Sequence, residues 1–403
     1  MSKNHRRIGR SEKVSPIKPI LGRVALALVG LFLGLSAAEI GLRVCDYEGS
    51  HERRSTVFDG DLGQLRVDSW VHLAVFDPRR SDHVVVNGQR VAFEKEGGLT
   101  RVVFIGDSAT WGAGVEPGQA YPAVFRDLEK TRCEADLEVL NAAVIGMTMV
   151  GEYRLLADRL VMLQPDVVVL GLFMANDINW NLGNEHLLDE SPSVWVRLWG
   201  QLRTHSALAH FAHLRLLAFS ADSGAFGGYG GVQPESSVLG LKLIDDAGMH
   251  MLDYFGGEIA TYKRRYSAPM EHAFVLLQDL LSRFDSLAAA HDFQFVVLVI
   301  PTASQIDDRL LMFRWPDPWG TVQRRGYDLS EEDLDFQKPL NRVREMCAET
   351  GILCIDPTED LRRLGAARVI IRGDDHPSPA GHRVLASSLV ARFDSQNHQF
   401  VNR

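Results

Sequence analysis

The sequence predicts an α/β fold in which a parallel sheet lies between layers of helices. From residue 101 onward, short runs of apolar, largely β-branched residues alternate with longer amphipathic segments, as strands and helices do when they alternate along a chain. The run VVVLGLF is continuously apolar, which is typical of a strand covered by helices on both faces of a parallel sheet.

Five strands are expected, separated by helices. The predicted strands are RVVFIG, LEVLNAA, DVVVLGLF, FQFVVLVIP and ILCID, at 101–106, 137–143, 166–173, 293–301 and 352–356. The predicted helices span 120–130, 151–163, 267–290, 334–349 and 378–393. Ser267 and Ser378 are predicted N-caps, and Pro379 occupies the first helical position of the last helix.

Two regions fall outside the alternating pattern. Before it, HVVVNGQRVAF predicts a short hairpin that turns at Asn87-Gly88. Within it, residues 179–265 contain no clear strand–helix unit and form a predicted insertion. The expected organisation is a basic leader at 1–18, a membrane segment at 19–44, an extension at 45–100 and a main domain at 101–395 that carries the insertion.

The first 44 residues resemble a membrane anchor. Residues 24–38 carry no charge, and the stretch from 19 to 42 is long enough to cross a bilayer. Lysines and arginines precede it, which places the N-terminus in the cytoplasm and the rest of the chain outside. We favour an uncleaved single-pass anchor. The alternatives are a signal peptide cleaved after Ser36-Ala37-Ala38, and a buried helix of a soluble protein.

Composition excludes some classes of function. The chain of 403 residues has a formal net charge of −9, and nucleic-acid binders normally carry a basic surplus, so no nucleic acid is expected as a partner. Its four cysteines lack metal-type spacing. Cys347 and Cys354 are close enough to pair, but we interpret them as two separate buried thiols. We expect neither a metal nor a cofactor.

Reactive residue types follow the predicted strands. In an open parallel sheet, ligand sites form at the carboxyl ends of the strands, so segments at those ends converge on one edge. The segments are Gly106-Asp107-Ser108 after the first strand, Gly146 after the second, Asn176-Asp177 after the third, and Asp374-Asp375-His376 before the last helix.

These residues form a complete set for acyl transfer. The hydroxyl of Ser108 needs an adjacent base, which His376 can supply, and the imidazole needs an acid on its other nitrogen. Asp374 is two residues before His376 and is favoured over the adjacent Asp375. An oxyanion requires donors already in place, for which the N–H groups of Ser108 and Gly146 and the side-chain amide of Asn176 are candidates.

In order and spacing, the four segments resemble the blocks of the SGNH, or GDSL-type, hydrolase superfamily. The resemblance covers residues 101–392 and implies a flavodoxin-like three-layer α/β/α sandwich. It also implies that Ser108 is the nucleophile, that His376 is the base, and that Ser108, Gly146 and Asn176 form the oxyanion hole. Met174 stands where the family usually has glycine. Asp374 gives the Asp-x-His spacing of a subset that includes some polysaccharide O-acetyltransferases.

Structural interpretations compete with these roles. Ser108 is a possible helix cap, and Asp374, Asp375, His376 and His382 are possible metal ligands, although no second cluster supports a metal site. We expect His382 to be structural. Asp107 and Asp177 are expected to support the catalytic loops through hydrogen bonds to the backbone.

The predicted function is ester hydrolysis outside the cytoplasm through an acyl-enzyme, with an ester of a glycan or lipid as the substrate class. The first alternative is acyl transfer to a hydroxyl of a cell-envelope or exported polysaccharide. The second alternative is a glycan-binding protein without catalytic activity.

Overall fold

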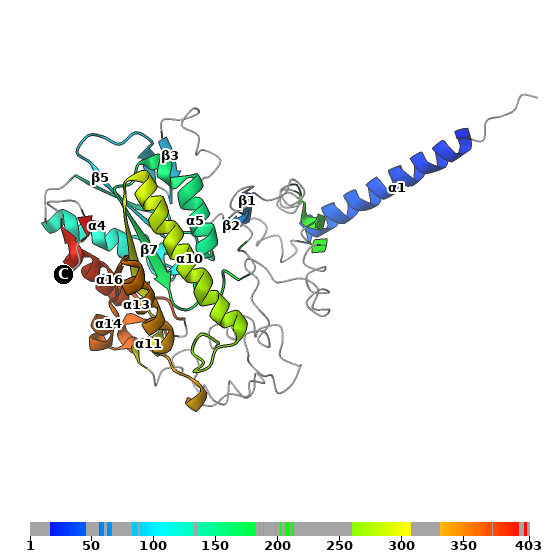
Figure 1. Cartoon of the computed structure of the whole chain (residues 1–403). Helices are drawn as coiled ribbons and strands as arrows, with labels where there is room; N and C mark the ends of the chain where they lie inside the picture. The colour runs from blue at the N-terminus through cyan, green and yellow to red at the C-terminus, as the bar shows by residue number, and fades with distance from the viewer. Residues whose placement is uncertain are drawn as a thin grey trace, which may run out of the picture.

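The computed structural model has a central parallel sheet with helices packed on both faces (Figure 1). It describes residues 17–45, 83–182 and 260–400, apart from gaps at 88, 133–135, 308–330, 373 and 395–398. Residues 56–59 and 63–66 and a few positions between 185 and 212 are also described. Most of the predicted insertion, including Trp195 and Trp199, lies outside the described residues.

The sheet has five strands in the order β6-β5-β7-β8-β9, and each neighbouring pair is parallel. The first strand of the sheet therefore lies between the second and the third, as in flavodoxin-like folds. This order confirms the predicted fold class and creates a switch point between β5 and β7. The strands are β5 (Thr100–Gly106), β6 (Leu137–Asn141), β7 (Val167–Phe173), β8 (Gln294–Ile300) and β9 (Leu353–Ile355).

Apolar clusters attach a layer of helices to each face of the sheet. Every residue of β5 and β7 is buried, because side chains from both faces of each strand contact helices. One layer contains α5 (Met149–Asp158), α10 (Ala268–His291) and α13 (Lys338–Thr350). The other contains α4 (Tyr121–Arg132), α14 (Thr358–Leu364) and α16 (Pro379–Arg392).

Short elements complete the fold. They are α3 (Ser108–Trp111), η3 (Pro117–Gln119), η4 (Leu160–Leu163), α11 (Ala303–Ile306), η7 (Glu331–Asp333) and α15 (Ala366–Val369), with the paired strands β1 (Thr56–Asp59) and β2 (Gly63–Arg66), and β10 (Phe393–Asp394) and β11 (Gln399–Phe400).

The predicted hairpin is confirmed as β3 (His83–Val86) paired with β4 (Gln89–Ala92). Asn87 has a φ of 44°, and its side-chain amide donates to the carbonyls of Asn141 (2.5 Å) and Ala143 (3.1 Å). Val84, Val86, Val91 and Phe93 of the hairpin belong to the same apolar cluster as α5 and α10, and Phe400 of β11 belongs to the opposite cluster. Residues on either side of the predicted limits 101–395 thus pack into the core of the sheet.

Two predictions of local structure are wrong, the end of one helix and the state of two cysteines. The helix expected at 151–163 ends at Asp158 and is followed by η4. Ser267 and Ser378 are the N-cap residues of α10 and α16, as predicted, but only the Ser378 hydroxyl makes a capping bond, by accepting from the N–H of Gly381. Cys347 and Cys354 form a disulfide, with Cα atoms 6.0 Å apart. The close approach arises because α13 ends and the chain reverses into β9 within seven residues.

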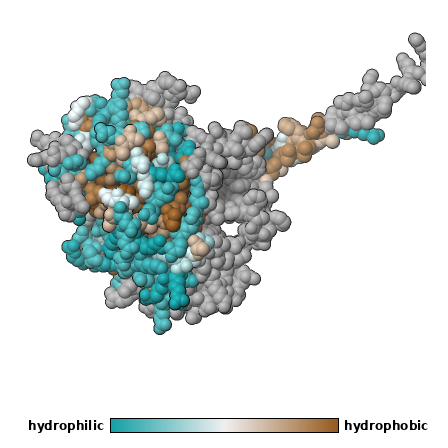
Figure 2. Space-filling view, viewed as in Figure 1, coloured by the Kyte–Doolittle hydropathy of each residue, from teal (hydrophilic) through white to brown (hydrophobic). Residues whose placement is uncertain are grey.

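At the N-terminus, α1 (Ile17–Val44) is a single long helix that extends away from the rest of the protein (Figure 1). Its segment Leu26–Val44 is apolar and long enough to cross a membrane, and none of that segment is buried within the protein. Figure 2 shows this apolar stretch beside a largely hydrophilic main body. The exposure argues against the buried helix of a soluble protein and fits either an anchor or a signal sequence.

Candidate active site

Ser108 begins the short helix α3, directly after the β5 strand. Asp107 caps this helix by accepting from the N–H of Ala109 at 2.9 Å, so the nucleophile candidate has a fixed backbone at a helix N-terminus. Gly106 has a φ of 151°, and a Cβ at this position would be 2.1 Å from the Thr110 hydroxyl. The tight turn from β5 into α3 therefore requires glycine.

His376 contacts both of the groups that a catalytic base needs. Its Nε2 is 2.7 Å from the Ser108 hydroxyl, and its Nδ1 is 2.5 Å from an Asp374 oxygen. The same Asp374 oxygen also accepts from the backbone N–H of His376 at 3.3 Å. Residues separated by 268 positions in the chain thus form a continuous Ser–His–Asp array.

The loop that holds His376 is tied to its surroundings by backbone bonds. Ile371 donates to the His376 carbonyl at 2.9 Å, and Ser378 donates to the Val369 carbonyl at 2.8 Å. The ring of Phe173, at the end of β7, packs against the imidazole with centroids 5.6 Å apart. The orientation of the imidazole therefore depends on neighbouring elements as well as on Asp374.

Electrostatics favour the protonated form of His376. Burial acts to lower its pKa, but the hydrogen bond and charge of Asp374, followed by the charges of Asp107 and Asp375, raise the pKa above its usual value. The imidazole side chain is 17% exposed and Asp374 is 46% exposed. Asp375 is buried and does not contact either imidazole nitrogen, so the geometry favours Asp374 as the acid.

Asn176 lies in the turn after β7 with its side chain buried. Its amide nitrogen donates to Asp107 at 2.8 Å, on the oxygen that the Ser108 hydroxyl faces at 3.4 Å. An amide nitrogen has two N–H groups, so Asn176 keeps a second donor beside the nucleophile. Asp107 accepts from both Ala109 and Asn176, which partly offsets the effect of burial in raising the Asp107 pKa.

Gly146 lies in an exposed turn after β6, with a φ of 72°. The loop that carries it is attached to the nucleophile turn, because the N–H of Val144 donates to the Gly106 carbonyl at 3.0 Å. Within the described residues, the N–H of Gly146 donates no hydrogen bond. The structure thus brings the Gly146 loop to the same sheet edge but shows no direct contact between Gly146 and Ser108.

Asp177 and His382 each hold a segment of the site region through a hydrogen bond with a backbone N–H. Asp177 accepts from the N–H of Phe173 at 2.7 Å and so closes the turn that presents Asn176. His382 is buried in α16, and its Nδ1 accepts from the N–H of Tyr121 at 3.2 Å. Burial lowers the pKa of His382 to about 3, with a smaller contribution from the charge of His376. Across the described residues, no cluster of three or more His, Cys, Asp or Glu side chains is arranged to hold a metal ion.

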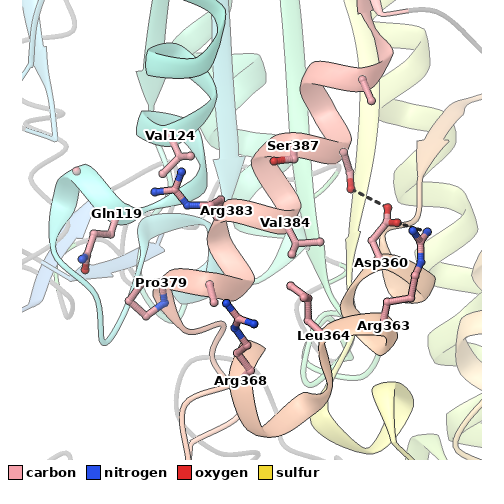
Figure 3. A pocket seen from close by; sticks show the side chains of 14 residues that line it. Gln119, Val124, Asp360, Arg363, Leu364, Arg368, Pro379, Arg383, Val384 and Ser387 are labelled. Carbon is pink, nitrogen blue, oxygen red and sulfur yellow. Dashed lines mark hydrogen bonds and ion pairs between the residues drawn. The ribbon is translucent and has the colours of Figure 1, made fainter. Parts of the chain in front are cut away.

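Two grooves lie close to helices of the main domain. The larger, about 730 Å³, runs between α4, α14 and α16 (Figure 3) and contains none of the predicted site residues. Arg363, Arg368 and Arg383 contribute to its walls, and Arg363 is paired with Asp360. The second, about 600 Å³, reaches α3. It is lined by Asn87, Gln89, Trp111, Gly112, Val115, Pro117, Pro122, Ala123, Arg126, Val139 and Asn141.

Sequence reasoning missed two residues that support this site. Phe173 was assigned only to a buried strand, yet its ring contacts His376. Glu152 is completely buried in α5 and was not among the candidate site residues. A signal was present for Glu152, because it is three and four residues before the apolar pair Leu155 and Leu156 and therefore shares their helix face.

No family model matches the sequence, and no curated protein matches it. Several solved structures have a similar fold. They include TesA, at 13% identity and a TM-score of 0.36 over 72% of this chain and 97% of that one. A putative G-D-S-L family lipolytic protein from Desulfitobacterium hafniense has 12% identity and a TM-score of 0.35 over 72% and 97%.

A catalytic mutant of Axe2, an acetylxylan esterase from Geobacillus stearothermophilus, has 15% identity and a TM-score of 0.36 over 75% and 98%.

Proposed function

We propose that this protein is a serine esterase that works through an acyl-enzyme, with Ser108 as nucleophile, His376 as base and Asp374 as orienting acid. The observation that carries the proposal is the array from the Ser108 hydroxyl to His376 at 2.7 Å and on to Asp374 at 2.5 Å. A helix cap alone would not require the serine hydroxyl to face an imidazole whose other nitrogen faces a carboxylate.

In the acylation step, Ser108 Oγ attacks the ester carbonyl carbon while His376 Nε2 takes the hydroxyl proton. The tetrahedral oxyanion is stabilised by the Ser108 N–H, the free N–H of the Asn176 amide and the Gly146 N–H. When the intermediate collapses, the ester C–O bond breaks and His376 returns the proton to the departing alcohol. Water then attacks the acyl-enzyme with the same base, which releases the carboxylic acid and restores Ser108.

Transfer of the acyl group to a sugar hydroxyl is the second candidate, favoured by the groove beside α3. Trp111 ends the helix that Ser108 begins, and Asn87, Gln89 and Arg126 line the same groove. An aromatic face flanked by hydrogen-bond donors and acceptors suits a sugar ring, so an acceptor hydroxyl bound there would replace water in the second step.

We further propose that α1 anchors the protein in a membrane, with the N-terminus in the cytoplasm and the catalytic domain outside. Support comes from the exposed apolar segment Leu26–Val44 and from the basic residues that precede it. The anchored enzyme would act on an ester carried by a glycan or lipid of the cell envelope.

The test uses the full-length protein in detergent and a fluorophosphonate probe. We expect the probe to label wild-type protein at Ser108 and p-nitrophenyl acetate to be hydrolysed, with both activities lost in Ser108→Ala. Hydrolysis by Ser108→Ala at the wild-type rate would refute the mechanism. With an acetyl donor and an oligosaccharide, ester formed on the sugar would identify transfer, and free acetate alone would identify hydrolysis.

A further inference from the structure

Glu152 is a buried acid that the mechanism above does not use. It lies in the first turn of α5, and its side chain has no exposed surface. Neither of its carboxyl oxygens has a hydrogen-bond partner among the described residues. An isolated carboxylate is strongly disfavoured in such a place, so this group needs either a partner or a proton.

Asp177 is a second buried acid whose hydrogen bonding is incomplete. Its side chain is buried, and one oxygen accepts from the N–H of Phe173 at 2.7 Å. The other oxygen is buried and has no hydrogen-bond partner in the described part of the chain. Two carboxyl groups can both satisfy their oxygens if one keeps its proton and donates it to the other, because a protonated carboxyl gains an O–H donor.

The backbone holds the two acids in neighbouring segments. Asn181 accepts from the N–H of Val150 at 3.1 Å and donates to the Asp177 carbonyl at 2.6 Å. Its side chain thus joins the Asp177 turn to α5 at a point two residues before Glu152. Burial and the negative charge of Asp177, with a smaller effect of Asp107, raise the pKa of Glu152 well above its usual value.

We propose that Glu152 and Asp177 form a carboxyl–carboxylate pair behind the active site, in which Glu152 carries the proton and donates its O–H to the free oxygen of Asp177. The proton belongs on Glu152 because Asp177 already accepts an N–H, which stabilises its charged form. Asp107 is not the acceptor of the Glu152 proton, because it already accepts from Ala109 and Asn176. The charge of His376 also stabilises the ionised form of Asp107.

The pair makes Glu152 a positioning residue. Its O–H fixes the Asp177 carboxylate, Asp177 closes the turn at Phe173, and that turn presents the Asn176 amide to Asp107 and to the proposed oxyanion hole. Loss of the proton donor would leave the Asp177 oxygen unpaired and let the turn shift. The expected consequence is a lower kcat rather than weaker substrate binding.

Two substitutions test this chain of contacts. Glu152→Gln keeps the size and supplies an N–H donor to Asp177, so kcat is expected within about threefold of wild type. Glu152→Ala removes the donor and is expected to lower kcat about 10- to 100-fold with little change in KM, as small misplacements of catalytic groups do. Asp158→Asn, at the end of the same helix, is the control and should leave both constants unchanged. Equal losses in the Gln and Ala variants, or wild-type kcat in folded Glu152→Ala, would overturn the proposal.

Infrared spectroscopy tests the proton without relying on Glu152→Ala folding. The wild-type protein at neutral pH should show the carbonyl stretch of a buried protonated carboxylic acid, and Glu152→Gln should lack it. A wild-type spectrum without this band, or a band that persists in Glu152→Gln, would refute the pair. Only the kinetic readout rests on the proposed function. Absence of esterase activity in wild type, with the band present, would count against the esterase and not against the pair.

Discussion

The geometry predicts that Asp374→Asn cripples catalysis while the same change at the neighbouring Asp375 does not. Asp374 is 2.5 Å from His376 Nδ1, so it holds the tautomer in which Nε2 is free to take the Ser108 proton. An asparagine amide can instead donate to Nδ1, which puts the imidazole proton on Nε2 and blocks that step. Asp375 is buried but touches neither imidazole nitrogen, so its substitution leaves the tautomer unchanged.

The expected loss of kcat in Asp374→Asn depends on how far Asp374 is exposed to solvent. Removing the charge of a triad acid in a buried setting lowers kcat by about 10⁴-fold. Asp374 is 46% exposed, so water can replace part of its role and the asparagine side chain can turn its oxygen toward Nδ1. We therefore expect a loss of about 10²- to 10³-fold, which corresponds to roughly 3–4 kcal/mol in the activation free energy.

The assay is kcat/KM for p-nitrophenyl acetate measured across pH. Because Asp374 raises the pKa of His376 and the base must be neutral to act, wild-type activity should rise with pH through an inflection above 6.5. In Asp374→Asn the inflection should move to lower pH. A loss in Asp375→Asn that exceeds the loss in Asp374→Asn, or an unmoved inflection, would refute the assignment of the acid.

Three further predictions concern the oxyanion hole, a buried histidine and the disulfide. Asn176→Ala should raise the activation free energy by about 3 kcal/mol, which lowers kcat on the order of 10²-fold with substrate binding nearly unchanged, and near-normal kcat would exclude Asn176 from the hole. His382 has a pKa lowered to about 3, so the unfolded chain binds a proton between pH 6.5 and 3 that the folded chain rejects, and folding stability falls as pH falls through that window. Urea unfolding from pH 6.5 to 4.5 should show wild type losing about 2–3 kcal/mol more than His382→Asn, and parallel pH curves would contradict this. Replacing both Cys347 and Cys354 by alanine removes a cross-link with a sequence separation of 7 and should lower the free energy of unfolding by roughly 2 kcal/mol relative to oxidised wild type, whereas reduced wild type should unfold like the variant.

Much of the fold was predictable from local pattern. The five strands are short apolar runs and the helices have clear apolar faces, so periodicity located them from neighbouring residues alone. The predicted limit of one helix is wrong, because packing rather than the pattern of apolar residues decides where that helix ends. The helix expected at 151–163 breaks after Asp158, although its apolar residues continue through Leu163.

The site was predictable to the extent that strand order determines it. Parallel strands bring their carboxyl ends to one edge, so Ser108, Asn176 and His376 could be expected near each other before any distance was known. The choice between Asp374 and Asp375 needed the loop geometry, because adjacent residues differ only in the direction in which their side chains point. The 2.5 Å contact of Asp374 with Nδ1 is a property of the folded loop.

The sequence by itself determined the order of strands and helices, the apolar N-terminal helix and the chemical types that gather at the sheet edge. These depend on residue identity and spacing along the chain. Only the tertiary structure decided the pairing of Cys347 with Cys354 and the choice of Asp374 over Asp375 as the partner of His376. Both contacts depend on how the chain folds back on itself. The direction in which a side chain points, and the group that it meets, are properties of the packed chain and not of neighbouring residues in the sequence.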